Sequence, residues 1–191
     1  MPAKPRSPLL VYRLRVELLD IAPLIWRRLL VPADIKLPKL HQCLQLAMGW
    51  TDSHLHQFKV GETHYGIPDP EWPELEMLDE RRIRLCDLIG EAQRELGYEY
   101  DFGDGWELRI VLEQAEPPNE FMRYPLCTAG ERACPPEDVG GVPGYEEFLK
   151  TIVDPKHEEY GQSLLWAGAG AFDPEGFDLN AVNRALRRVR L

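Results

Sequence analysis

The sequence predicts an α+β fold, in which an antiparallel or mixed β-sheet carries its helices mainly on one side. Strand patterns dominate the first 115 residues and amphipathic helix patterns dominate the rest, an order that favours α+β over an alternating α/β arrangement. The length of 191 residues suits one sizeable core. We therefore expect residues 9–191 to form a single domain.

Four segments of the first half predict two pairs of strands. Leu10–Leu18 alternates apolar and charged residues, as a half-buried strand does, and Leu24–Val31 returns after the break at Ala22-Pro23. His54–Val60 and Thr63–Ile67 then predict a hairpin around a Gly-Glu turn.

Helical spacing predicts the remaining regular elements. Pro38 suits the first turn of a helix that ends at Gly49. Short elements are expected at residues 83–85 (strand) and 87–96 (helix, closed by Gly97), with a loop at 68–80 between them and the first hairpin. Residues 117–143 are too rich in Pro and Gly for regular structure, so we expect an irregular cover. Helices follow from Tyr145, at 157–167, and from an Asp178 N-cap.

The segment Tyr98–Trp106 predicts a central hairpin. A loop of three residues, 103–105, places Phe102 opposite Trp106 and keeps the apolar face intact. Gly105 then takes the left-handed position. This register sets Asp101 opposite Glu107, which is unfavourable unless solvent or a cation relieves it.

Composition and charge limit the cellular compartment and the classes of partner that we expect. No apolar run approaches the roughly 20 residues that span a bilayer, and residues 1–8 are interpreted as a disordered leader rather than an export signal, so we expect a cytoplasmic protein without membrane contact. The net charge is −10, and the 28 acidic residues between positions 41 and 177 face only 10 basic ones. Such an acidic block repels phosphate backbones, so nucleic acid is not the expected partner.

The candidate site combines the hairpin tip with a later loop. Carboxylates at the tip are the kind of group that holds a divalent cation through oxygen, and the Cys134–Gly141 loop adds two more. The candidate cleft residues are Asp101, Asp104, Trp106, Glu107, Glu137 and Asp138. The alternative is that Asp104 is only a turn residue and the other acids are solvated.

Two further groups are weaker metal candidates. Cys127 and Cys134 offer two thiolates, but structural zinc sites use four ligands and the chain has no second close pair. His54 and His56 place two imidazoles on one face of a strand, where structural or surface roles are the more frequent explanation. No cofactor is predicted, and a divalent metal remains a hypothesis.

Basic residues of the first two strands are the nucleic-acid candidates. They are Arg13, Arg15, Arg27 and Arg28, the last two beside a Trp that suits base stacking. On an alternating strand, one of the two neighbouring arginines is expected to be merely exposed.

Five motifs together resemble the plasmid pRi ORF-3-like family over roughly residues 9–190. They are Ile25–Arg28, Leu40–Trp50, His54–Phe58, Tyr98–Trp106 and Cys134–Tyr145. The resemblance implies a protein of unknown biochemical function, since most members are uncharacterised proteins of bacteria, archaea and mobile elements. Many members have His where this chain has Leu108, and Cys where it has Val139, so a family metal site at those positions would lack two ligands here.

Some members of that family are labelled transposon resolvases, and the residues of this chain do not support such chemistry. A tyrosine recombinase needs a His-x-x-Arg box, and none of the five His is followed by Arg at that spacing.

The sequence leaves three hypotheses for the function. The favoured one is a binding module for a protein or small ligand, ahead of a metal-dependent hydrolase using the hairpin carboxylates and a nucleic-acid accessory protein.

Overall fold

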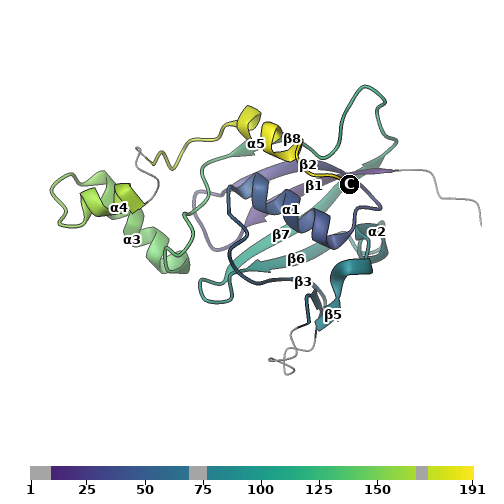
Figure 1. The fold of residues 1–191 in the computed structure, drawn as a ribbon, viewed down its shortest axis with the longest axis horizontal. Helices are drawn as coiled ribbons and strands as arrows, with labels where there is room; N and C mark the ends of the chain where they lie inside the picture. The colour runs from purple at the N-terminus through teal and green to yellow at the C-terminus, as the bar shows by residue number, and fades with distance from the viewer. Residues whose placement is uncertain (1–9, 69–76, 167–171) are drawn as a thin grey trace, which may run out of the picture.

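The computed structural model describes residues 10–68, 77–166 and 172–191 (Figure 1). Within them, eight strands form one mixed sheet in the order β5-β4-β3-β6-β7-β1-β2-β8, in which only the β4–β5 pair is parallel. The strands are β1 (Val11–Leu18), β2 (Trp26–Pro32), β3 (His56–Val60), β4 (Thr63–Gly66), β5 (Met77–Asp79), β6 (Glu95–Tyr100), β7 (Trp106–Glu116) and β8 (Leu126–Glu131). The predicted leader lies outside the described residues.

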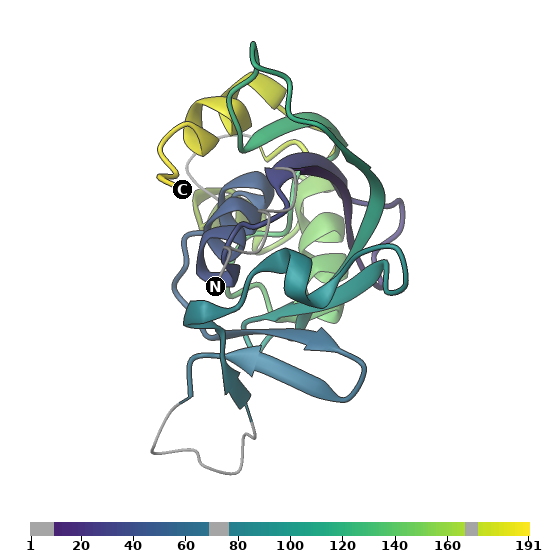
Figure 2. The ribbon, with the colours of Figure 1, turned by 90° about the vertical axis from the view of Figure 1, so that its right-hand side faces the viewer.

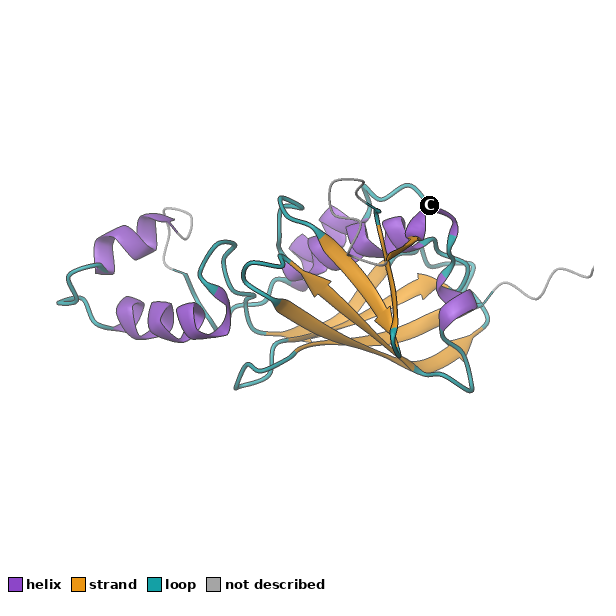
Figure 3. Cartoon of the chain, turned by 90° about the horizontal axis from the view of Figure 1, so that it is seen from below, coloured by secondary structure: helices purple, strands orange, loops and turns teal. Residues whose placement is uncertain are grey.

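Helices cover one face of the mixed sheet, which confirms the predicted α+β class (Figure 3). They are α1 (Leu37–Met48), α2 (Leu85–Leu88), α3 (Gly141–Val153), α4 (Tyr160–Trp166) and α5 (Leu179–Leu186), with a 3-10 turn, η1 (Glu80–Arg82). α1 and α5 lie together over one face, whereas α3 and α4 extend beyond one end of the sheet (Figure 1). β5, β4 and β3 form one edge of the sheet, and α5 lies near the other edge (Figure 2).

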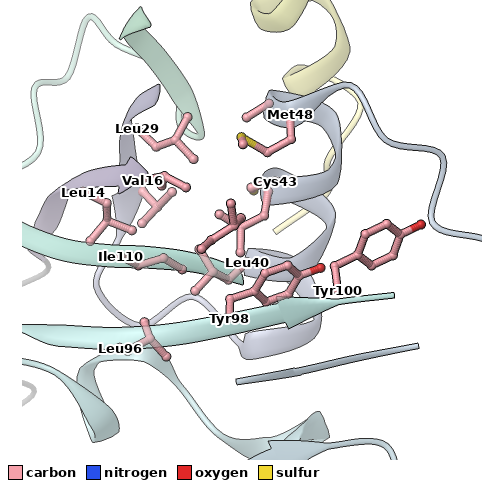
Figure 4. Close-up of a cluster of buried hydrophobic side chains, with 14 of the residues drawn as sticks. Leu14, Val16, Leu29, Leu40, Cys43, Met48, Leu96, Tyr98, Tyr100 and Ile110 are labelled. Atoms are coloured by element: carbon pink, nitrogen blue, oxygen red, sulfur yellow. The ribbon is translucent and has the colours of Figure 1, made fainter. Parts of the chain in front are cut away.

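The core lies between α1 and the sheet. Alternation along β1 buries Leu14 and Val16, and the helical stripe of α1 buries Leu40 and Cys43 against them (Figure 4). Each fully buried Leu of this kind contributes about 1.5–3 kcal/mol. Gly49 ends α1 in the left-handed conformation, with φ 92°, as its position in the sequence predicts.

The central hairpin differs from the prediction. Tyr100 pairs with Trp106, so the loop has five residues and Phe102 has left the strand. The cause is Asp101, whose backbone is left-handed (φ 57°) and whose carbonyl oxygen accepts from Gly105 N at 2.6 Å. The predicted opposition of Asp101 and Glu107 is therefore wrong, whereas Gly105 is left-handed as predicted, with φ 68°.

The register instead places Glu99 opposite Glu107 on the outer face. Lys59 of β3 lies between them and binds both carboxylates, at 2.8 and 2.9 Å. The cation that the like charges require thus comes from the neighbouring strand. Arg109 of β7 pairs with Glu95 of β6.

The predicted helix over residues 87–96 is wrong. α2 ends at Leu88, and Gly97 lies inside β6 rather than at a helix end. A Cβ at Gly97 would stand 3.3 Å from the Cβ of Lys59, so the close approach of β3 explains the glycine. The expected strand at residues 83–85 is only an isolated bridge between Lys36 and Arg84.

The predicted irregular cover contains an edge strand, β8. The side-chain amide of Asn183 in α5 pairs with Cys127 as a strand would: it accepts from Cys127 N and donates to Cys127 O, each at 2.8 Å. An exposed edge is thereby covered by a helix. Among the described helices, none has the length and apolarity to cross a membrane.

Candidate metal centre

Three segments that are far apart in the sequence meet at one end of the sheet. They are the connection from α1 to β3, the β6–β7 hairpin loop, and the loop before α3. Each brings one ligand atom, from His54, Asp101 and Asp138, and these atoms all lie within 4.8 Å of one another. We call these three residues the ligand cluster.

Asp101 is held with one oxygen free for the cluster. Its Oδ1 accepts from the backbone N–H groups of Gly103 and Asp104, at 3.0 and 3.3 Å. Its Oδ2 lies 3.6 Å from His54 Nε2. The side chain is largely buried, so the turn that moved Phe102 out of the strand also fixes this carboxylate.

His54 directs a buried ring nitrogen at both carboxylates. Its Nε2 lies 3.2 Å from Asp138 Oδ1, yet it makes no hydrogen bond of good geometry within the described chain. A buried polar atom without a partner is costly and calls for an explanation. A ligand to a metal ion is one such explanation, because the neutral imidazole nitrogen is a common metal ligand.

Asp138 is the exposed member of the ligand cluster, and its neighbour Glu137 anchors it. Glu137 Oε1 accepts from Tyr100 Oη at 2.5 Å and from Thr51 N at 3.0 Å, and the Thr51 hydroxyl donates to Oε2. Burial raises the pKa of Glu137, but these hydrogen bonds outweigh it and leave the pKa below its ordinary value. Asp138 itself has a left-handed backbone (φ 58°), which points its carboxylate back toward His54.

The loop before α3 also packs directly on the hairpin tip. Gly140 N donates to Asp104 Oδ2 at 3.2 Å. Gly141 has a φ of 67°, and a Cβ there would stand 2.5 Å from Asp104 O. The glycine pair Gly140-Gly141, which resembles a phosphate loop in sequence, therefore allows close contact between the hairpin tip and the start of α3.

Each segment of the ligand cluster carries one further carboxylate within three residues of the ligand: Asp52, Asp104 and Glu137, which we call the acidic rim. Asp52 has a left-handed backbone (φ 60°) and is fixed by His41, whose Nε2 lies 2.7 Å from Asp52 Oδ1, and by Gln45, which accepts from its N–H. Within the described residues, no Lys or Arg hydrogen-bonds to the acidic rim or the ligand cluster.

His56 does not join His54. Its ring stacks on that of His41, with centroids 3.6 Å apart, and its Nε2 lies 3.2 Å from the buried carboxylate of Glu80. Burial, and then His56, lower the pKa of His41. This buried stack belongs to the contact between α1, β3 and η1 rather than to the ligand cluster.

Two predicted cleft residues lie elsewhere. Trp106 is 1% exposed and stacks near Trp50, so it belongs to the core beneath the site. Glu107 lies on the outer sheet face, where it binds Lys59, because the five-residue loop shifts the register.

The two cysteines proposed as metal ligands join no group of metal-ligating side chains in the described chain. Both are buried beside Arg27. Burial raises the pKa of the Cys134 thiol to about 12, which keeps it protonated at neutral pH. A metal ion would therefore have to displace this proton at a larger energetic cost than from an exposed thiol.

The nucleic-acid candidates are occupied by other contacts. On the outer sheet face, Arg13, Arg15 and Arg28 pair with Glu116, Glu17 and Glu113 respectively. The fourth, Arg27, is 2% exposed and donates to four backbone carbonyls: those of Trp26, Ala47, Glu131 and Arg132. These contacts weigh against a free basic surface for phosphate.

Several residues of the site were not identified from the sequence. Thr51 and Tyr100 hold Glu137, and Asp52 supplies a rim charge. The available signal was indirect: the Trp50–Ser53 segment follows a helix end, where a polar run is read as an ordinary loop. Asp101, Asp138 and His54 were individual candidates, but their convergence depends on the three-dimensional path of the loops.

Comparison with known proteins gives consistent matches over nearly the whole chain. The model of the plasmid pRiA4b ORF-3-like protein family matches residues 10–181. The uncharacterized protein y4hQ of Sinorhizobium fredii is 39% identical over 177 residues, which cover 92% of this chain and 90% of that protein. The crystal structure of MM3350, a protein of unknown function from Methanosarcina mazei Go1, has a TM-score of 0.82 and 39% identity, and covers 91% of this chain and 98% of that chain. These matches confirm the resemblance inferred from the motifs.

Proposed function

The chain belongs to the plasmid pRiA4b ORF-3-like family, and from this premise and the geometry of the ligand cluster we propose that it is a binding module for a divalent metal ion. The observation that carries the proposal is the convergence of one imidazole nitrogen and two carboxylate oxygens within 4.8 Å, from three separate segments.

The distances suit one metal ion. Two ligand atoms that each lie about 2.1 Å from a tetrahedral ion are about 3.4 Å apart. The separations of His54 Nε2 from Asp138 Oδ1 and from Asp101 Oδ2 are 3.2 and 3.6 Å. The cluster therefore needs little rearrangement to hold an ion.

The donor set selects the class of metal. Imidazole suits Zn²⁺, Co²⁺, Fe²⁺ and related ions, whereas Ca²⁺ and Mg²⁺ prefer sites built from oxygen alone. A nitrogen donor with two carboxylates favours a first-row transition ion. The side chain of Asp138 is 70% exposed, so the ion would keep open coordination positions toward solvent for a small ligand or for a segment of a partner protein.

Hydrolysis is the second candidate function, because three protein ligands with an open position are typical of catalytic zinc sites. A hydrolase also needs a base for the attacking water. Glu137, which directly precedes Asp138, is the carboxylate to consider as this base. Hydrogen bonds from Thr51 and Tyr100 occupy both of its oxygens. That engagement favours binding over catalysis.

Metal uptake tests the proposal. Untagged protein is dialysed against Zn²⁺, Co²⁺ or Mn²⁺, and bound metal is measured by elemental analysis. We expect one ion per chain, with at least tenfold weaker binding in Asp138→Asn and in His54→Gln. Asp34→Asn, an exposed acid at the far end of α1, is the matched control and should bind as the native protein does. Absence of binding, or equal binding in both site variants, would contradict the proposal.

A further inference from the structure

We infer that the ligand completing the coordination of the metal ion carries no negative charge, so that it is a neutral or cationic molecule. The inference rests on the proposed function, because it concerns the open positions of an ion held by His54, Asp101 and Asp138. It follows from the charges that surround the ligand cluster.

The charge balance near the ion stays negative after the metal binds. A divalent ion cancels the charges of Asp101 and Asp138, because His54 is neutral when it is a ligand. The acidic rim of Asp52, Asp104 and Glu137 then remains. An incoming phosphate or carboxylate would approach these three charges, and the interaction between like charges is unfavourable.

The acidic rim differs from the acids of the outer sheet face. There, Glu17, Glu113 and Glu116 each pair with an arginine, and Lys59 serves two other glutamates. On the outer sheet face, basic side chains thus neutralise these carboxylates. Around the ligand cluster, by contrast, the hydrogen bonds of the described carboxylates come from backbone N–H groups, hydroxyls and His41.

The rim charges are also fixed in position. Asp52 is held by His41 and Gln45, Asp104 by Gly140, and Glu137 by Tyr100 and Thr51. Such carboxylates cannot swing away from an approaching anion without losing hydrogen bonds. A preorganised negative rim therefore discriminates between ligands by charge as well as by donor atom.

The experiment compares two ligands that share one donor and differ in charge. Protein loaded with Co²⁺ is titrated with 4-(aminomethyl)pyridine, whose substituent is cationic, and with isonicotinate, whose substituent is anionic. Neither molecule chelates, and cobalt visible absorption reports coordination. We expect the cationic pyridine to bind about tenfold more tightly at low salt, and the difference to shrink at high salt.

Charge-only variants test the role of the acidic rim. Asp104→Asn keeps an oxygen that accepts from Gly140, and Asp52→Asn keeps one for His41 on a backbone that Asn tolerates. Each variant should reduce the preference several-fold, and Asp34→Asn should leave it unchanged. Two variants guard against a single one that fails to fold.

The outcomes separate this inference from the proposed function. Equal affinity for the two pyridines, or tighter binding of isonicotinate, in a protein that takes up Co²⁺ would overturn the ligand preference alone. Failure of the native protein to take up Co²⁺ would overturn both.

Discussion

Asp101 illustrates how one residue sets both the local fold and the chemistry. Its left-handed backbone ends β6, and its Oδ1 closes the turn by accepting from Gly103 and Asp104. Oδ2 is left to face His54. A strand prediction that maximises the apolar face does not detect this turn. Asp is one of the few side chains that tolerate the left-handed region, so its presence permits the turn without requiring it.

Arg27 is the other residue whose role the structure revises. Alternation along β2 places it on the core side, where its guanidinium meets four carbonyl oxygens and the ring of Phe177 at 4.3 Å. Carbonyl dipoles, rather than a carboxylate, therefore stabilise the buried charge. Burial lowers its pKa, in spite of the neighbouring Cys134 and Cys127.

Arg27→Met should destabilise the protein by about 3 kcal/mol or more, because several buried carbonyls lose their donors at once. Urea denaturation followed by circular dichroism measures the free energy of unfolding. Arg13→Met is the control: it removes a partly exposed ion pair and should change stability by about 1 kcal/mol at most. Similar losses in the two variants would contradict a structural role for Arg27.

At the scale of elements, the site is a contact between loops. The hairpin tip and the loop before α3 touch where Gly141 lies against Asp104, and that contact brings Asp138 to His54. Glu137 adds a second attachment through Tyr100 of β6. The loop that carries Asp138 thus depends on close backbone packing.

Gly141→Ala should lower stability by about 1–3 kcal/mol, because the new Cβ meets Asp104 O and the residue has a positive φ. It should also weaken metal binding at least several-fold by moving Asp138 away from His54. Gly161→Ala in α4 is the control, since nothing lies within 4 Å of its Cβ position. If Gly141→Ala bound metal as tightly as the native protein, the two loops would not be coupled as described.

Elements with strong periodicity were predicted, and those set by tertiary contacts were not. β1, β2 and α1 follow their apolar patterns closely. Only the start of β6, Glu95 and Leu96, falls within the predicted helix, because Gly97 reads as a helix end although it accommodates the close approach of Lys59. β8 lies in a stretch rich in Pro and Gly, and the amide of Asn183 covers its edge from α5.

The site was predictable only in part, for a related reason. Its acids and His54 could be recognised singly from residue type. Their grouping required the order of the sheet strands, which sets the hairpin beside β3, and the path of the loop before α3. Glu107 was assigned to the cleft because the predicted loop was two residues too short.

At the scale of the whole molecule, burial of thiols makes the free energy of unfolding decrease at alkaline pH. Burial raises the pKa of both Cys43 and Cys134 from 9.0 to about 12. Above pH 9 the unfolded thiols lose protons that the folded ones keep. The stability that they contribute is therefore complete below pH 9 and is lost as the pH rises toward 12.

Each of these thiols should lower the free energy of unfolding by about 1.4 kcal/mol per pH unit across that range. Urea denaturation at pH 8, 9.5 and 10.5 measures the slope. The double variant Cys43→Ala/Cys134→Ala should be less stable at pH 8 but have a shallower slope. Cys86→Ala, which removes an exposed thiol, should retain most of the native slope. An unchanged slope in the double variant would refute the assignment.

The fold as a whole brings His54, Asp101 and Asp138 together at one end of the sheet. The central claim, a metal ion at that point, is tested most directly by anomalous diffraction from a crystal grown with Zn²⁺. The account predicts one strong peak about 2.0–2.2 Å from His54 Nε2 and from one oxygen each of Asp101 and Asp138. A crystal with no peak there, or with zinc held instead by Cys127 and Cys134, would contradict it.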